Sequence, residues 1–396
     1  PGLLEFSRHD RGGSDAAELD ETIDAIAADL NRRINLSQGR LVQVALLDHG
    51  SVRPPQMLAA IHHLVVDAVS WWVLLQDLDT AYGQLNSGRG IVLPAKSSSI
   101  REGAAELASY ARSPQVVASI GCWADSDGAA PMPLDFADGS NDRGSARTVS
   151  IELDRANTSR LIHEVPAAFR VQVPEVLLAA LRRSARWAPD APIRVDLEGH
   201  GREEIAPDLD LLRTVGWFTS IYPVELSGDS GSAPEQVLAE VKEQLRAVPA
   251  RGLDYGVLRY MHPDATLRTR LGRQRPADIL FNYLGQWDQT LASSDRFAFE
   301  RPIMALRDSD AVREHVLEVN AMVFNGVLRI DITYSENLHN STTIERLAGD
   351  IHNEVRKLID ASVDHERSVL TPSDFPSAGL DQDELDNILD EFGEQG

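Results

Sequence analysis

The order of the predicted strands and helices in residues 147–359 most strongly narrows the folds open to this chain. Alternating or continuous apolar runs predict strands, and apolar residues at helical spacing predict helices. Several of the strands follow one another without a helix between them, so the regular alternation of a doubly wound sheet is absent. The sequence therefore predicts an α/β fold on a mixed sheet, with strands at 147–153, 193–197, 218–224, 279–283, 315–324 and 327–334 and helices at 173–187, 233–246 and 342–359.

The preceding part of the chain has the same mixture of elements. Apolar spacing predicts helices over 16–33 and 69–86 and strands over 41–47 and 57–61. Residues 126–145 are rich in Asp, Gly and Pro, which favours a loop or crossover. We therefore expect an N-terminal lobe at 1–145 and a C-terminal lobe at 146–380.

Composition limits the partners and the environment of the protein. The 396 residues include 38 Lys and Arg against 61 Asp and Glu, a net charge of −23, which argues against nucleic acid or an anionic membrane as a partner. Cys122 is the single cysteine, which excludes an intrachain disulfide and a multi-cysteine zinc site. No apolar stretch approaches the roughly 20 residues of a membrane span. We expect a cytoplasmic protein.

The C-terminal segment 381–396 carries seven acidic residues and no basic one. Leu385, Ile388, Leu389 and Phe392 nevertheless recur in it at helical spacing. A short helix with one apolar stripe cannot bury that stripe by itself. The pattern indicates either a linker that frays or a helix that docks on a partner.

A pair of histidines stands at a predicted strand end, in HHLVVDAVSW (62–71). Two adjacent residues point to opposite sides of an extended chain, so at most one of His62 and His63 faces a given cavity. Asp67 lies four residues beyond His63, where it could orient the imidazole or hold an arginine. Histidines near an apolar run are also often purely structural, and the spacing leaves both interpretations open.

A second candidate group follows the apolar strand at 193–197, in EGHGRE (198–203). Glycines on both sides of His200 allow a sharp turn or the close approach of a ligand. Glu198 stands at the strand end, where pockets usually form. An ordinary strand exit with surface charges would give the same pattern.

Two further segments combine aromatic and polar residues. Residues 216–224 (GWFTSIYPV) contain three aromatics, a pattern typical of core. Asn282 and Tyr283 lie within an apolar strand and need hydrogen-bond partners if they are buried, either in the backbone or in a polar pocket.

Several kinds of chemistry find no support in the sequence. The chain has no P-loop, no GxGxxG after a strand, no GxSxG and no HExxH. A metal site built from His62, His63 and His200 has no supporting spacing, so we expect no metal.

Taken together, these segments resemble the epimerization domain of nonribosomal peptide synthetases, over residues 30–385. HHLVVDAVSW resembles the HHxxxDxxSW signature of the family, and EGHGRE resembles the motif that separates epimerization domains from condensation domains. Ala68 replaces the usual glycine after the motif aspartate. The resemblance begins inside the first lobe of the family, so we expect this lobe to lack its usual first elements. Further matching blocks follow in the expected order: LPAKSSS, TVGWFTSIYPV, YGVLRY, FNYLGQ and TPSDFPSAGL.

The resemblance implies two lobes similar to chloramphenicol acetyltransferase that meet at a V-shaped cleft with a central tunnel. The implied reaction inverts the Cα of an aminoacyl or peptidyl thioester, from L to D. The substrate hangs on the 4'-phosphopantetheine of a peptidyl carrier protein, and the domain needs no cofactor of its own.

The resemblance also implies two groups that move protons. Glu198, from EGHGRE, would remove the α-proton, because a positioned base is required for this step. His63 would stand on the opposite side of the substrate, as acid, as base or as a stabiliser of the enolate.

Four other residues receive supporting roles from the resemblance. Asp67 would orient the helix start and pair with an arginine, and Arg202 would anchor its turn. Asn282 and Tyr283 would donate hydrogen bonds to the enolate oxygen or position the second proton donor.

Other racemase chemistries lack the residues they need. A pyridoxal racemase requires a buried lysine, whereas Lys242 and Lys357 are expected on charged helices and Lys96 in a Ser-rich loop. A two-thiol racemase requires two cysteines. Two alternatives to an epimerase remain, a condensation domain that forms amide bonds and a non-catalytic scaffold for carrier-protein docking. A docking helix at 381–396 would lead to a downstream condensation domain.

Overall fold

Two sheets form the frame of the protein in the computed structural model, and each belongs to a separate compact unit. Unit 1 consists of Pro1–Gly103, Asp208–Phe218 and Thr290–Asp308, and unit 2 of Ala104–Pro207, Thr219–Gln289 and Ser309–Gly396. The structure describes residues 4–10, 16–50, 53–124, 128–286, 294, 296–298, 309–363, 370–375, 377–382, 384, 385 and 387.

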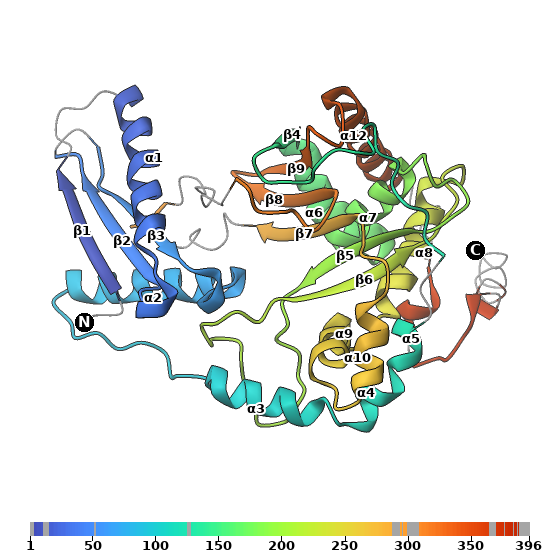
Figure 1. The fold of residues 1–396 in the computed structure, drawn as a ribbon, viewed down its shortest axis with the longest axis horizontal. Coiled ribbons are helices and arrows are strands. Elements are labelled where there is room, and N and C mark those ends of the chain that lie inside the picture. The colour runs from blue at the N-terminus through green and yellow to red at the C-terminus, as the bar shows by residue number, and fades with distance from the viewer. Residues whose placement is uncertain are drawn as a thin grey trace. The chain divides into compact units, whose positions relative to one another are not determined.

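The sheet of unit 1 has three strands in the order β1–β2–β3, with helix α1 (Ala16–Arg33) beside it (Figure 1). Strand β1 (Leu4–Asp10) runs parallel to β2 (Val42–Asp48), and β2 runs antiparallel to β3 (Gln56–Ile61). Apolar side chains of α1 and β2 pack together as the core of this sheet: Ile23, Ile26, Leu30, Ala45 and Leu47.

Short turns and one long helix complete the first part of unit 1. The 3-10 turn η1 (Leu36–Gln38) precedes β2, and η2 (His63–Val65) follows β3. Helix α2 (Ala68–Asn86) begins shortly after η2. The predictions for α1, β2, β3 and α2 are confirmed to within one residue at each end, whereas β1 was not predicted.

The sheet of unit 2 has six strands in the order β4–β9–β8–β7–β5–β6. The pairs β5–β7 and β7–β8 are parallel, and the other three pairs are antiparallel. The predicted α/β fold with a mixed sheet is therefore confirmed. The strands are β4 (Ala146–Leu153), β5 (Ile193–Gly199), β6 (Ser220–Leu226), β7 (Ile279–Gln286), β8 (Leu317–Phe324) and β9 (Val327–Ser335).

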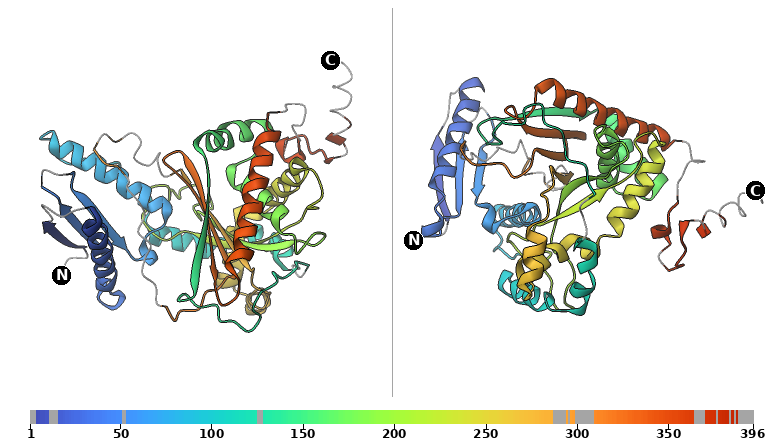
Figure 2. Two further views of the ribbon diagram at one scale, coloured as in Figure 1. Left: turned by 90° about the horizontal axis from the view of Figure 1, so that it is seen from above. Right: turned by 45° about the vertical axis from the view of Figure 1, so that its right-hand side comes forward.

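Four helices cover one face of this sheet, as Figure 2 shows in its left view. They are α6 (Arg155–Phe169), α7 (Val173–Ser184), α8 (Pro234–Arg246) and α12 (Ser341–Ala361). Pro174 lies in the first turn of α7, where its missing N–H leaves no helix bond unmade. The large apolar core of the unit lies between these helices and the sheet.

The opposite face of the sheet carries polar side chains. Successive residues of a strand point to opposite faces, and Val195, Leu197 and Phe281 point to the apolar core. Their neighbours along the strands therefore point away from it, and these include Asp196, Glu198 and Asn282.

A second apolar cluster in unit 2 joins smaller helices, with Trp123, Tyr255 and Leu258 among its buried members. The predicted loop at 126–145 contains no helix or strand in its described part, residues 128–145. The elements of this region are α3 (Ile100–Tyr110), α4 (Pro114–Ala118), α5 (Ile120–Ala124), η3 (Pro249–Gly252), α9 (Leu253–Gly256), the π-helical turn η4 (Val257–Met261) and α10 (Ala265–Gly272).

Ion pairs hold the 3-10 turn η6 (Pro372–Asp374) against α8. Lys242 Nζ lies 2.6 Å from Asp374 Oδ2, with both side chains 1% exposed, and Arg246 Nη1 lies 3.0 Å from Asp374 Oδ1. The expected position of Lys242 on a charged helix is therefore confirmed, but the lysine is buried, contrary to the expectation that the chain has no buried lysine. Its ammonium is buried because a carboxylate from outside the helix pairs with it.

The predicted boundary between the lobes, at residues 145 and 146, stays a prediction. So do the arrangement of the lobes, the V-shaped cleft and the tunnel. Of the predicted C-terminal helix, Leu385 is described and buried. Ile388, Leu389 and Phe392 lie outside the described residues. Within the described part of the chain, no helix is both long enough and apolar enough to cross a membrane.

Candidate functional site

The histidine pair follows β3 and has two different surroundings. His62 caps η2, and its Nδ1 accepts the backbone N–H of Leu64 at 3.1 Å. His63 is the first residue of η2, and it is exposed. The His62 ring is therefore engaged with the turn, whereas the His63 side chain is exposed.

Asp67 accepts hydrogen bonds from the start of α2 and from Phe218, which lies far away in the sequence. Its buried carboxylate caps the helix, with Oδ1 accepting the N–H of Ser70 at 2.7 Å. Its Oδ2 accepts the N–H of Phe218 at 3.1 Å. A capping carboxylate satisfies N–H groups that the helix leaves unpaired, so Asp67 joins the helix start to residues 216–218. The predicted arginine partner stays a prediction.

Ser70 makes a second link between the same two segments. Its hydroxyl accepts the N–H of Gly216 at 3.0 Å and donates to the Gly216 carbonyl at 2.9 Å. A Cβ at position 216 would come within 2.8 Å of Ile100 and 2.9 Å of Phe218. A larger residue here would therefore require the Ile100 or Phe218 side chain to move.

The aromatic run at 216–224 is not simply core, and the expectation is wrong for Trp217. Trp217 precedes β6 and is 48% exposed. Its ring centroid lies 5.0 Å from that of His63, with 56° between the ring planes. No pattern in the sequence indicates this contact, because the two residues belong to segments far apart in the chain.

Glu198 and Asn282 meet on the polar face of the unit 2 sheet. Strands β5 and β7 are parallel neighbours, with Leu197 opposite Phe281. This register brings the next residue of each strand together, and Asn282 Nδ2 donates to Glu198 Oε2 at 2.7 Å. The amide therefore holds one carboxylate oxygen and orients the Glu198 side chain on this face.

Asp196 and His315 form another pair on this face, and the sequence analysis missed it. His315 Nε2 lies 2.8 Å from Asp196 Oδ2, and the imidazole is buried. Asp196 stands two residues before Glu198, so strand alternation puts both carboxylates on the same face. The spacing of two residues between Asp196 and Glu198 could have indicated from the sequence that Asp196 also lies on this face.

Tyr283 lies on the other side of its strand from Asn282. It is the register partner of Ala321 and packs against the apolar core of unit 2. Burial raises the pKa of Tyr283 to about 12, so the phenol stays neutral. The structure does not bring Tyr283 together with Glu198.

The turn after β5 is held by contacts within EGHGRE. The backbone N–H of Arg202 donates to His200 Nδ1 at 3.0 Å, and His200 Nε2 lies 3.3 Å from Glu203 Oε1. Arg202 is itself buried. These contacts fix the path of the chain after Glu198, and the anchoring role of the Arg202 side chain stays a prediction.

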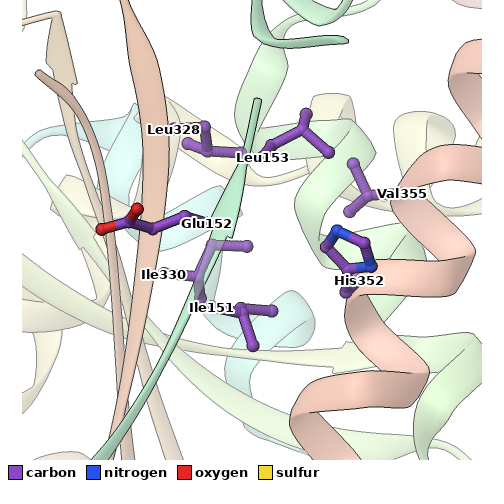
Figure 3. A pocket seen from close by; sticks show the side chains of 7 residues that line it. All are labelled: Ile151, Glu152, Leu153, Leu328, Ile330, His352 and Val355. Atoms are coloured by element: carbon purple, nitrogen blue, oxygen red, sulfur yellow. The ribbon is translucent and has the colours of Figure 1, made fainter. Parts of the chain in front are cut away.

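Figure 3 shows a small pocket elsewhere in unit 2, between β4, β9 and α12. The Glu152 carboxylate points away from it (Figure 3), which leaves His352 as its polar side chain. None of the candidate site residues lines it. The lining residues are Ile151, Glu152, Leu153, Leu328, Ile330, His352 and Val355. Among the described residues, no group of three or more His, Cys, Asp or Glu side chains could hold a metal ion.

The candidate residues thus form two groups, one in each unit. His63 and Asp67 belong to unit 1, with Trp217 beside them, and Glu198 and Asn282 belong to unit 2.

Comparison with known proteins gives consistent results along the chain. The family model described as "Condensation domain" matches residues 4–380. A linear gramicidin synthase from Brevibacillus parabrevis is 38% identical over 378 residues, which cover 94% of this chain and 5% of that protein. Chondramide synthase from Chondromyces crocatus is 38% identical over 384 residues, 96% of this chain and 10% of that protein. The chain therefore spans a small part of the length of these relatives.

Among solved structures, the epimerization domain from the third module of tyrocidine synthetase B is similar to this chain. The TM-score is 0.83 at 32% identity, and the match covers 92% of this chain and 81% of that one.

Proposed function

The chain belongs to the condensation-domain family of nonribosomal peptide synthetases, and we propose that it inverts the Cα of an aminoacyl or peptidyl thioester from L to D. The observation that carries the proposal is the hydrogen bond of 2.7 Å that orients the Glu198 carboxylate. A general base must be positioned within reach of the proton that it removes, and this hydrogen bond limits the positions open to the carboxylate. The 32% identity with a solved epimerization domain supports the same choice within the family.

In the proposed reaction, Glu198 removes the α-proton from one face of Cα. The electron pair of the broken C–H bond passes into the enolate of the thioester. The His63 imidazolium gives a proton to the opposite face, and the new C–H bond has the inverted configuration. Glu198 is then protonated and His63 neutral, and both exchange protons with solvent to restore the starting state.

In the proposal, the role of each supporting residue is inferred from the contacts that it makes. Asn282 orients the base, and Asp67 holds the helix start that follows His63. Arg202 stabilises the turn after Glu198. A direct role for Tyr283 stays a prediction, and its position against the core favours packing over a hydrogen bond to the enolate.

The proposed substrate is delivered by a peptidyl carrier protein. Its phosphopantetheine thioester is part of the substrate, so the proposed reaction needs no cofactor held by this domain. A downstream condensation domain, reached through the helix at 381–396, stays a proposed further partner. Removal of residues 381–396 followed by a product-transfer assay tests that partner.

The proposal is tested with an aminoacyl thioester on a carrier protein in D2O, without an acceptor amine. We expect deuterium at Cα and a mixture of L and D products. Glu198→Gln and His63→Ala each lower the inversion rate by about 10²–10⁴-fold, the usual contribution of a general acid or base, and leave carrier binding unchanged. Glu152→Gln, an exposed carboxylate on the same polar face of the sheet, is the matched control and keeps the wild-type rate.

Amide-bond formation is the alternative that the family match itself raises. A condensation domain would consume the thioester only when an acceptor amine is present, and would leave Cα without deuterium. That outcome, or near-normal inversion by either variant, contradicts the proposal.

A further inference from the structure

Trp217 contacts His63, the exposed histidine of the pair. The two ring centroids lie 5.0 Å apart, which is within the distance over which an aromatic face attracts a cation. The geometry points to Trp217 as a positioning residue for His63, whose indole packs against the imidazole and holds it in place. This inference rests on the proposed function, because it assigns a purpose to the protonated ring.

The backbone on both sides of Trp217 is fastened to the start of α2. Gly216 exchanges two hydrogen bonds with Ser70, and the Phe218 N–H donates to Asp67. Three hydrogen bonds therefore hold the backbone that carries the indole, although the Trp217 side chain is half exposed. These contacts hold the backbone on both sides of Trp217, although the residue lies outside any strand or helix.

The interaction with the indole depends on the charge of the imidazole. A protonated ring is a cation and is attracted by the face of the indole, whereas a neutral ring gains only packing. Removal of the indole therefore favours the neutral form of His63.

The test is the titration of the His63 ring, followed by NMR with labelled histidine in the full chain and assigned with His63→Gln. We expect its midpoint to fall by about half a pH unit in Trp217→Leu, the size that a partly exposed cation–π contact gives. Trp217→Phe keeps an aromatic face and should show a smaller shift. The wild-type chain should also show a nuclear Overhauser contact between the two rings.

Trp72 supplies the matched control. It lies on α2 in the same unit and is 40% exposed, similar to Trp217. Trp72→Leu should leave the His63 midpoint unchanged. An equal shift in this variant, or an unchanged midpoint in Trp217→Leu, would overturn the inference.

The inversion rate gives a second readout that a merely structural role would not move. Because the L-to-D direction uses protonated His63, the rate falls as pH rises through its midpoint. In Trp217→Leu this alkaline limb should move to lower pH by the same half unit, whereas a folding defect would lower the rate at every pH. If the NMR midpoint moves and the wild-type chain inverts no substrate, the ring contact stands and the proposed function fails.

Discussion

At the scale of single residues, the contact between Asn282 and Glu198 is the one on which the account depends most. The sequence identified both residues as candidates but could not pair them. They stand 84 positions apart, and their contact follows from the parallel register of β5 and β7. Strand alternation, in contrast, was readable from the sequence, and it separates Tyr283 from Asn282.

Asn282 offers a direct test of the proposal that Glu198 is an oriented base. Asn282→Ala removes the hydrogen bond to Glu198, and we expect the inversion rate to fall about 10-fold. Asn282→Asp places a second carboxylate beside Glu198, where one of the two carboxyls is held protonated. We expect this variant to lose about 100-fold at neutral pH.

The matched control for this test is Asn320→Ala, which removes the amide in register with Asn282 on β8. It should leave the inversion rate within about twofold. Wild-type rates in both Asn282 variants would show that the amide does not orient the base.

At the scale of elements, prediction succeeded where the pattern was long and regular. The alternating residues of β4, β8 and β9 and the apolar stripe of α12 identified these elements to within about two residues at each end. Helix α6 was missed because it contains Pro166 and many polar residues. Strand β1 was missed because its short alternating run includes charged residues, and its pairing with β2 brings distant residues together.

The docking of η6 on α8 gives a prediction about stability. Loss of one partner from a buried ion pair leaves the other charge uncompensated. We therefore expect Lys242→Met to lower the free energy of unfolding by about 3 kcal/mol, measured by urea denaturation. Lys357→Met removes an exposed lysine that also pairs with a carboxylate and should cost less than about 1 kcal/mol.

The same pair makes stability depend on pH. Burial raises the pKa of Asp374, but the hydrogen bonds from Lys242, Thr371 and Arg246 outweigh burial, and the pKa is lowered below 3.8. A lowered carboxyl pKa stabilises the fold above the unfolded value, and this stabilisation is lost as pH falls through the folded value. Unfolding free energies measured from pH 6 to 2 should fall less steeply in Asp374→Asn than in wild type. Equal slopes would contradict this assignment.

At the scale of the whole molecule, the compact units are assembled from separated segments. Asp208–Phe218 joins the unit that contains His63, although Glu198, shortly before it in sequence, belongs to the other unit. The sequence identified the mixed fold and the candidate residues, largely through motifs. The sequence could not predict the contact between Trp217 and His63. That contact forms because the chain returns to unit 1 at Asp208–Phe218, after it has built part of unit 2.

The central claim is that Glu198 and His63 serve opposite faces of one Cα. The most direct measurement is deuterium uptake from D2O by the L thioester, compared with its inversion, in Glu198→Gln and His63→Gln. The account predicts that His63→Gln still exchanges the α-proton, because Glu198 removes and returns it on one face, while inversion is lost. Glu198→Gln should lose both exchange and inversion of the L substrate. Equal exchange in the two variants, or inversion that survives without His63, would contradict the account.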